Sequence, residues 1–296
     1  MDLEWNSVYG PKIRGFINEI IEIGAVMLDE NLKEIDTFSL FVKSKIGKRL
    51  QTRVRKMTNI NKQDLENGTP FPEAIEKFRQ WIGGREHVIL SWGDGDIRVL
   101  LSNTRYLTSQ RTLDYIMSYI DLQEYFRCRK HTSKSQQIGL SAAGELLGLD
   151  SSGFSMHRAL DDSRFSSYVF REIFEAESFF ARVRRCDPDF FAELEYKPRI
   201  ISDIKSQLVD QRQLFYLCRN CGKPAKQCTD WRFASRGFQA EFYCAGCDKR
   251  AKATVTFKKM YSSVEIKRSS REITEKPAQE PKPKQQSAPN PAPSSK

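Results

Sequence analysis

Residues 1–4 read Met-Asp-Leu-Glu, and residues 18–26 read Asn-Glu-Ile-Ile-Glu-Ile-Gly-Ala-Val. In an extended chain, side chains at positions i and i+2 point to the same side, so Asp2 and Glu4 can hold a divalent cation together. Such a pair is also typical of a solvated acidic terminus. Its interpretation therefore depends on the strands and acidic residues that follow.

The composition is that of an ordinary globular protein, with 39% hydrophobic and 29% charged residues among 296. No apolar run reaches the roughly 18 residues that a spanning helix needs, and no basic segment followed by an apolar one opens the chain. We therefore expect a cytoplasmic protein without a membrane partner. The length predicts one large domain and a smaller one.

The net charge of +10 is unevenly distributed. Lys and Arg number 31 against 31 Asp and Glu in residues 1–214, but 17 against 7 in residues 215–296. A neutral body with a basic appendage indicates that the appendage grips a polyanion. A solubilising tail is the simpler alternative.

The hydrophobic pattern predicts strands that alternate with helices. Segments 19–28 and 35–42 are expected to form adjacent antiparallel strands, and 87–92 a strand buried on both faces. Helices are expected at 71–81, after Gly93, at 140–147 and from about residue 158 onward, with a strand and a short helix within 112–127. The sequence thus predicts an α/β domain with a mixed sheet flanked by helices.

Two further acidic motifs follow these elements. Asp96 lies in the first turn of a helix after a buried strand, where open α/β sheets place ligands, whereas Asp94 fits a helix N-cap. His157 and Asp162 stand five residues apart at the start of an amphipathic helix, so a loop histidine could face the same point as the aspartate. Alone, His157 is also typical of a surface or capping residue.

The ordered set Asp2-x-Glu4, Trp92-Gly93-x-x-Asp96 and His157-x₄-Asp162 resembles the DEDDh family of 3′→5′ exonucleases, which have the RNase H-like fold. The resemblance covers about residues 1–175. The Trp-Gly form of the second motif resembles most the branch of the histone-mRNA 3′ exonuclease and the inhibitors of RNA interference. That branch implies RNA as the substrate, with DNA as the alternative.

The resemblance implies a catalytic site of Asp2, Glu4, Asp96, Asp162 and His157. The four carboxylates would hold two Mg²⁺ ions, or Mn²⁺ in their place, for phosphodiester hydrolysis. His157 would be the general base, because an imidazole exchanges a proton near neutral pH. Asp161 competes with Asp162 as the ligand, and the family spacing favours Asp162.

Two Cys-x-x-Cys knuckles, Cys218/Cys221 and Cys244/Cys247, are separated by 22 residues with strand-like segments around and between them. Two knuckles complete a tetrahedral site, so we expect a zinc ribbon with one structural Zn²⁺. A disulfide pair is the alternative, which a cytoplasmic chain disfavours. Cys228, Cys128 and Cys186 are expected to be ordinary thiols.

Cations and aromatic rings alternate around the knuckles, which is typical of single-strand binding, although some of these rings must form the ribbon core. The expected organisation is an exonuclease domain at 1–178, a helical connector at 179–213, the ribbon at 214–262 and a disordered tail at 269–296. A protein-binding ribbon is the alternative, and the sequence does not indicate an oligomeric state.

The sequence therefore predicts a two-metal 3′→5′ exonuclease that acts on single-stranded 3′ ends, with RNA favoured over DNA, and releases nucleoside 5′-monophosphates. A catalytically silent nucleic-acid-binding protein is the rival hypothesis. In the family, an apolar strand precedes the first two acids, and here that strand is apparently missing. We therefore expect either apolar residues upstream of Met1 in the natural protein or a weakened nuclease in which Asp2 frays.

Overall fold

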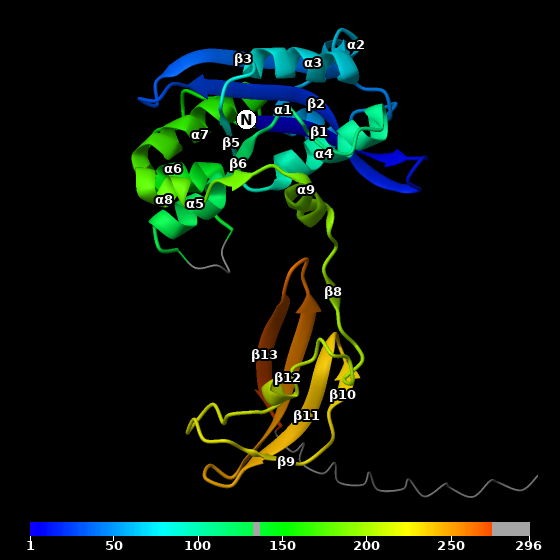
Figure 1. Ribbon diagram of the computed structural model, residues 1–296, viewed down its shortest axis with the longest axis vertical. Coiled ribbons are helices and arrows are strands. Elements are labelled where there is room, and N and C mark those ends of the chain that lie inside the picture. The colour runs from blue at the N-terminus through cyan, green and yellow to red at the C-terminus, as the bar shows by residue number, and fades with distance from the viewer. Residues whose placement is uncertain (133–136, 274–296) are drawn as a thin grey trace, which may run out of the picture. The chain divides into compact units, whose positions relative to one another are not determined.

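The computed structural model describes residues 1–132 and 137–273, and they form two compact units (Figure 1). Unit 1 spans Met1–Glu195, and unit 2 begins at Tyr196. Most of the predicted tail, residues 274–296, lies outside the described residues. Among the described helices, none is long and apolar enough to cross a membrane.

The main sheet of unit 1 has the strand order β1 (Asp2–Gly10), β2 (Gly15–Leu28), β3 (Glu34–Lys43) and β4 (Thr69–Pro70). The first three strands are antiparallel, and β4 runs parallel to β3. The predicted antiparallel pair at 19–28 and 35–42 is thus confirmed. β2 is long because its apolar residues are buried on both faces.

The expectation that Asp2 frays for want of a strand is wrong for this structure. Asp2 lies opposite Gly24 and Glu4 opposite Glu22, so the acids open a nine-residue strand instead of ending one. Two further bonds hold this end of β1, from the Met1 amino group to the Leu90 carbonyl (2.9 Å) and from the Leu3 N–H to Asp96 Oδ1 (2.9 Å). β2 supplies the pairing that a short terminal segment lacks alone.

A second sheet of unit 1 joins β5 (Val88–Ser91), β6 (Ser118–Asp121) and β7 (Arg184–Arg185), with β5 and β6 parallel. The described helices of unit 1 are α1 (Thr52–Thr58), α2 (Lys62–Glu66), α3 (Phe71–Ile82), α4 (Gly95–Thr108), α5 (Leu122–Arg129), α6 (Leu140–Leu146), α7 (Ala159–Ile173), α8 (Ala176–Phe180) and α9 (Pro188–Glu195). The alternation of strands and helices confirms the predicted α/β class.

Two apolar clusters fix the helices that carry the acidic motifs. The first packs α3 and α4 against β2, and it includes Phe190, Phe191 and Leu194 of α9. The second packs α5 against α7 and includes Phe179 of α8. The predicted helical connector at 179–213 is therefore divided, because residues through Glu195 bury their aromatic side chains in unit 1.

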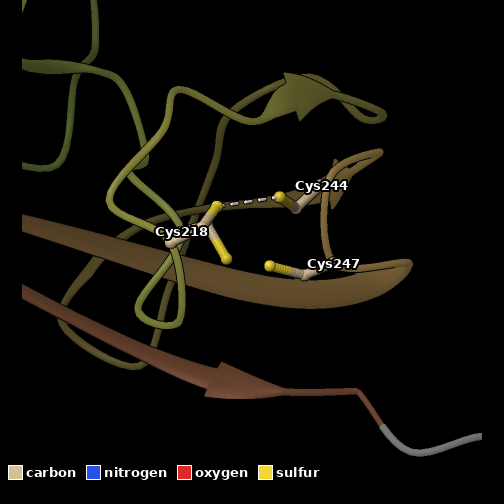
Figure 2. A group of neighbouring side chains, drawn as sticks. Cys218, Cys244 and Cys247 are labelled. Carbon is tan, nitrogen blue, oxygen red and sulfur yellow. Dashed lines mark hydrogen bonds between the residues drawn. The ribbon is translucent and has the colours of Figure 1, made fainter.

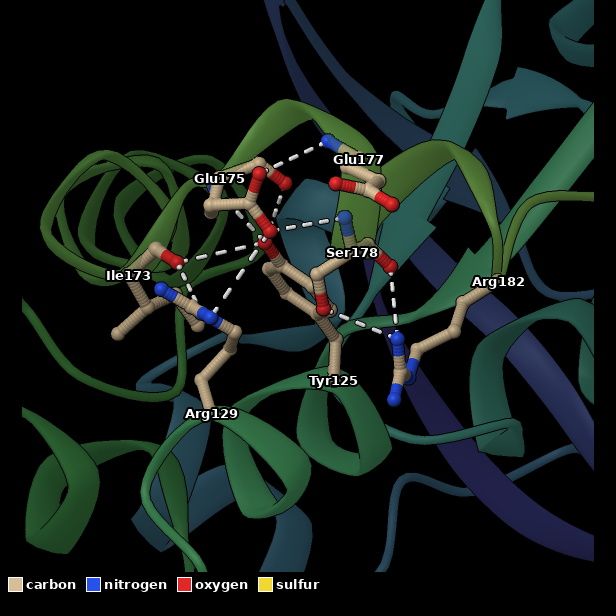
Figure 3. A network of polar contacts seen from close by, with 7 residues as sticks. All are labelled: Tyr125, Arg129, Ile173, Glu175, Glu177, Ser178 and Arg182. Carbon is tan, nitrogen blue, oxygen red and sulfur yellow. Dashed lines mark hydrogen bonds and ion pairs between the residues drawn. The ribbon is translucent and has the colours of Figure 1, made fainter.

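The C-terminal end of α7 is anchored by α5 (Figure 3). The Tyr125 hydroxyl donates to the carbonyl oxygens of Ile173 (3.3 Å) and Glu175 (3.2 Å), and it accepts a bond from the Glu175 N–H (3.0 Å). Arg129 Nε also donates to the Ile173 carbonyl at 3.0 Å. The bonds to the Ile173 carbonyl give a partner to a group that the helix end leaves without one, and so they fix the helix that bears Asp162.

Unit 2 is a six-stranded sheet whose main path is β10 (Arg232–Ala234), β11 (Gly237–Cys244), β12 (Lys249–Lys259) and β13 (Val264–Glu272). Short strands β8 (Arg199–Ile200) and β9 (Lys226–Gln227) pair with β12 and β11, and a 3₁₀ turn covers Gln211–Gln213. Residues 269–272, which we predicted to begin a disordered tail, pair with β12 instead. Polar residues on an exposed edge strand carry the same composition as a tail, which explains the error.

Candidate active site

The three acidic motifs of the sequence converge in unit 1. Asp2 and Glu4 come from β1, Asp96 from the first turn of α4 and Asp162 from the first turn of α7. One oxygen each from Glu4 and Asp162 and a ring nitrogen of His157 lie within 4.8 Å of one another. Groups separated by more than 90 residues in sequence therefore face one point.

The carboxylates of this cluster are held in an environment that disfavours their charge. Burial is the main cause of the raised pKa values, about 8 for Glu4, about 7 for Asp96 and about 6 for Asp162. The pKa of Asp2 is raised well above its ordinary value, first by burial and then by Asp96, Asp162 and Glu4. Neighbouring acids thus add to the effect of burial.

The donor set fits hard divalent cations. Asp162 Oδ2 accepts a bond from the His157 N–H (3.0 Å), while its Oδ1 is buried without a hydrogen-bond partner in the described chain. Such an orphaned oxygen is costly to bury, and a cation is the partner that carboxylates of this kind accept. A bound cation would also reduce the electrostatic repulsion between the neighbouring carboxylates.

The neighbouring acids Asp161 and Asp94 are directed elsewhere. Asp161 Oδ2 accepts from the Ser155 N–H at 3.1 Å, and it is absent from the group formed by Glu4, His157 and Asp162. The geometry thus favours Asp162, as the spacing did. Asp94 occupies the N-cap position of α4 but makes no capping bond, and instead pairs with Arg98 at 2.7 Å.

The loop that presents His157 is held by an ion pair between Arg158, whose side chain is 35% exposed, and the buried Glu22. His157 is exposed and has a left-handed backbone with φ of 67°. Arg158 donates to both oxygens of buried Glu22, from Nε at 3.2 Å and Nη2 at 2.8 Å, and lies over the Phe41 ring. Paired, hydrogen-bonded charges are the form in which a buried carboxylate is tolerated.

The backbone of α7 also packs directly on β2 at Gly24. A Cβ atom at Gly24 would lie 2.1 Å from the carbonyl carbon of Ala159 and 2.2 Å from the Leu160 nitrogen. Neither atom can move without shifting α7, which carries Asp162. Sequence reasoning assigned no role to Gly24, Glu22 or Arg158, although a glycine inside a strand signals close backbone approach.

Glu19, the other acid to which we assigned no role, shapes a loop. Its carboxylate is buried and accepts bonds from the N–H groups of Lys45, Ile46 and Gly47 at 2.6–2.8 Å, and from the Ser44 hydroxyl at 2.7 Å. All of its acceptor capacity is directed at residues 44–47, so we treat it as structural.

The cysteine knuckles of unit 2 converge as predicted, and Figure 2 shows the sulfur atoms of Cys218, Cys244 and Cys247 facing one another. The sulfur atoms of all four knuckle cysteines, including Cys221, lie within 4.8 Å of one another as free thiols. The disulfide alternative does not describe this arrangement. Four thiolates at this spacing fit a tetrahedral zinc site.

The aromatic residues around the knuckles lie mostly in the core of unit 2. Phe238 and Phe242 are buried, and Trp231 packs against both clusters of that core. Phe233 is 42% exposed, but its ring contacts Phe238. The expectation that cations and rings share one binding surface is therefore not supported.

Comparison with known proteins gives a family match. The model of the Exonuclease family, RNase_T, matches residues 2–170. The probable 3′-5′ exonuclease KapD of Bacillus subtilis is 28% identical over 166 residues, covering 55% of this chain and 76% of that protein. ERI1 exoribonuclease 2 of Xenopus laevis is 28% identical over 168 residues, covering 49% of this chain and 24% of that protein.

A solved structure supports the fold independently. It shows 3′-end-specific recognition of a histone mRNA stem-loop by a 3′-exonuclease. The TM-score is 0.50 at 18% identity, with 63% of this chain and 69% of that chain covered. The mixed sheet with flanking helices in unit 1 is thus the RNase H-like fold that the sequence predicted.

Proposed function

Because the chain belongs to the exonuclease family, as a metal-dependent 3′→5′ exonuclease of the DEDDh type, we propose that it degrades single-stranded RNA to nucleoside 5′-monophosphates. The observation that carries the proposal is the convergence of Glu4, His157 and Asp162 within 4.8 Å, beside the partly buried Asp2 and the buried Asp96. Three separate motifs meet at one point, which a solvated acidic terminus does not explain.

Asp2, Glu4, Asp96 and Asp162 would hold two Mg²⁺ or Mn²⁺ ions. When bound, the ions supply Lewis-acid stabilisation of charge on the attacking and leaving oxygens. His157 takes the proton from the attacking water, and its exposure leaves the ring free to do so. Arg158 and Glu22 hold the loop that orients this ring.

Two of the similar proteins support RNA over DNA, although two other curated relatives are PolC-type DNA polymerases. One curated relative bears the name exoribonuclease, and one structural neighbour recognises a histone mRNA stem-loop. The Trp92-Gly93 form of the second motif supports the same choice. DNA remains the alternative substrate, and a silent nucleic-acid-binding protein is the alternative function.

The test is digestion of a 5′-labelled RNA in Mg²⁺, with a DNA of matched sequence beside it. We expect a ladder that shortens from the 3′ end, faster on RNA, and that disappears in His157→Ala. His131→Ala is the matched control, because His131 is also exposed with a positive φ but lies outside the cluster. Degradation that persists in His157→Ala, or that is faster on DNA, contradicts the corresponding part of the proposal.

We also propose that Cys218, Cys221, Cys244 and Cys247 hold one structural Zn²⁺. The ion would stabilise unit 2, whose buried core is small. Metal analysis of the purified chain should find one zinc per chain, and a zinc-free folded unit 2 would contradict this assignment.

A further inference from the structure

The sheet of unit 2 has two unlike faces. Ala251, Ala253, Val255 and Phe257 of β12 are buried in the core, whereas the residues between them are partly or fully exposed. Cross-strand partners share a face, so the register assigns residues of β9, β10, β11 and β13 to the exposed side as well. We call this side the open face.

The open face is strongly basic. Its two carboxylates, Glu241 and Glu265, stand against seven cations, which are Lys226, Arg232, Arg250, Lys252, Lys258, Lys267 and Arg271. In the described chain, Lys267 is the one member of this set with an ion pair, to Glu265 at 3.2 Å. Clustered cations without carboxylate partners indicate a polyanionic ligand.

Hydroxyl groups lie among these cations at the centre of the sheet. Thr254 lies opposite Ser269, whereas the Thr256 hydroxyl, opposite Lys267, already donates to the Arg236 carbonyl oxygen at 3.2 Å. Phosphate oxygens accept bonds from hydroxyl, lysine and arginine groups, and such contacts position a nucleic acid without reading its sequence. Successive side chains on one face of a strand recur about every 7 Å, which gives a regular array for a regularly charged polymer.

Aromatic rings are almost excluded from this face. In the described residues it carries one ring, Tyr243, and the hydroxyl of that ring donates to Asp248 at 2.8 Å. Phe238 and Phe242 of the same strand point into the core. Base stacking requires exposed aromatic rings, so the open face lacks the stacking platform with which many proteins bind single strands.

We infer that the open face binds the sugar-phosphate backbone of the nucleic acid that the exonuclease unit degrades, through charge and hydroxyl contacts and without base stacking. The inference rests on the proposed function for the identity of the polyanion. It gives unit 2 a role in retaining substrates irrespective of their sequence. An acidic protein is the competing ligand that the experiment must separate.

The test uses the full chain in a His157→Ala background, so that the probe is not degraded. Arg250→Gln, Lys252→Gln and Arg271→Gln are combined, and anisotropy of a labelled single-stranded RNA is measured from 50 to 300 mM salt. We expect about tenfold or more weaker binding and a salt slope flatter by about 2, because each lost contact to a single strand contributes about 0.7. The loss should be equal for adenine-rich, uracil-rich and abasic strands.

The control combines Lys205→Gln, Arg219→Gln and Lys223→Gln, which remove the same charge from unit 2 outside the strands of the open face and should leave most of the binding. Thermal melting shows whether each variant remains folded. Equal binding of the RNA probe by the two triple variants overturns the inference. So does a result in which poly-glutamate displaces the probe more effectively than unlabelled nucleic acid does. A wild-type chain that binds RNA but does not digest it contradicts the proposed function and leaves this inference standing.

Discussion

The acidic cluster of unit 1 and the cysteine cluster of unit 2 are both suited to metal ions, but they are built in opposite ways. The acids come from three separated elements, and their pKa values are raised by burial and by one another. The cysteines come from two turns within 30 residues of chain. The acidic cluster offers hard oxygen ligands of the kind that catalytic Mg²⁺ or Mn²⁺ ions prefer. The cysteine cluster offers four soft sulfur ligands, which fill the coordination of a structural metal ion.

The largest effect is expected from a substitution that should unfold unit 2 but leave the catalytic activity of unit 1 intact. Cys244→Ser should abolish the folded state of unit 2, because structural zinc contributes on the order of 10 kcal/mol to small metal-bound folds. Unit 1 should keep its activity on a short oligonucleotide. Calorimetry and a digestion assay measure the two properties, with exposed Cys228→Ser as the control. A cooperative unit 2 in Cys244→Ser would remove the contrast between the clusters.

The opposite outcome, lost activity in a folded chain, is expected of Asp162→Asn. We expect activity to fall by more than about 100-fold, because even the outer partners of metal ligands cost 10–100-fold when removed. The fold should persist, since an amide removes charge repulsion from the cluster. Asp161→Asn is the matched control one residue away, with little expected change. Equal losses in the two variants would show that the orphaned oxygen of Asp162 has no special role.

A backbone contact is tested by Gly24→Ala. The added Cβ must displace α7 from β2, so we expect a loss of at least about 2 kcal/mol in stability and most of the activity. Gly84→Ala is the control, because a Cβ there meets no atom within 4 Å. Chemical denaturation measures both variants, and equal midpoints would contradict the packing argument.

The pH dependence of stability distinguishes the clusters further. The raised pKa values of Glu4 (about 8), Asp96 (about 7) and Asp162 (about 6) mean that the folded, metal-free chain binds more protons than the unfolded chain above about pH 4. Their contribution to stability is therefore fully present at low pH and is lost as pH rises from about 4 to 8. Mg²⁺ should raise the melting temperature of unit 1 more at pH 8 than at pH 6. An equal or reversed shift would contradict the assignment.

The smallest expected effect concerns the loop that carries His157. Glu22→Gln weakens the pairing with Arg158, and we expect kcat to fall about tenfold with KM little changed, as for outer-shell positioning groups. Glu22→Asp should recover part of kcat if charge is what matters. A change in KM alone would indicate that Glu22 acts in substrate binding instead.

The sequence predicted the main elements well where periodic patterns decide them. The strand at 19–28 and the helices that begin near Gly95 and Ala159 lie where expected, because their apolar residues are buried as the pattern requires. The acidic motifs and the cysteine knuckles also converge, since chemistry restricts both residue type and spacing.

The remaining features depend on contacts that no local pattern encodes. Glu22 and Arg158 are 136 positions apart, and their pairing follows from the tertiary packing of α7 on β2. Likewise, alternation along β11 shows two faces but not which face is covered, so the sequence did not show that Phe238 and Phe242 lie in the core while Tyr243 lies on the open face. The strand at 264–272 was missed because its polar sequence resembles a tail.

The bond from the Leu3 N–H to Asp96 Oδ1 spans 93 positions, and it has a consequence for folding kinetics. The active site can form only after the first strand has closed a loop of that length, whereas the cysteine cluster requires closure of about a third as many residues. Contacts of high sequence separation form slowly because their loop entropy must be overcome first. Unit 2 should therefore reach its native state before the nuclease site is assembled.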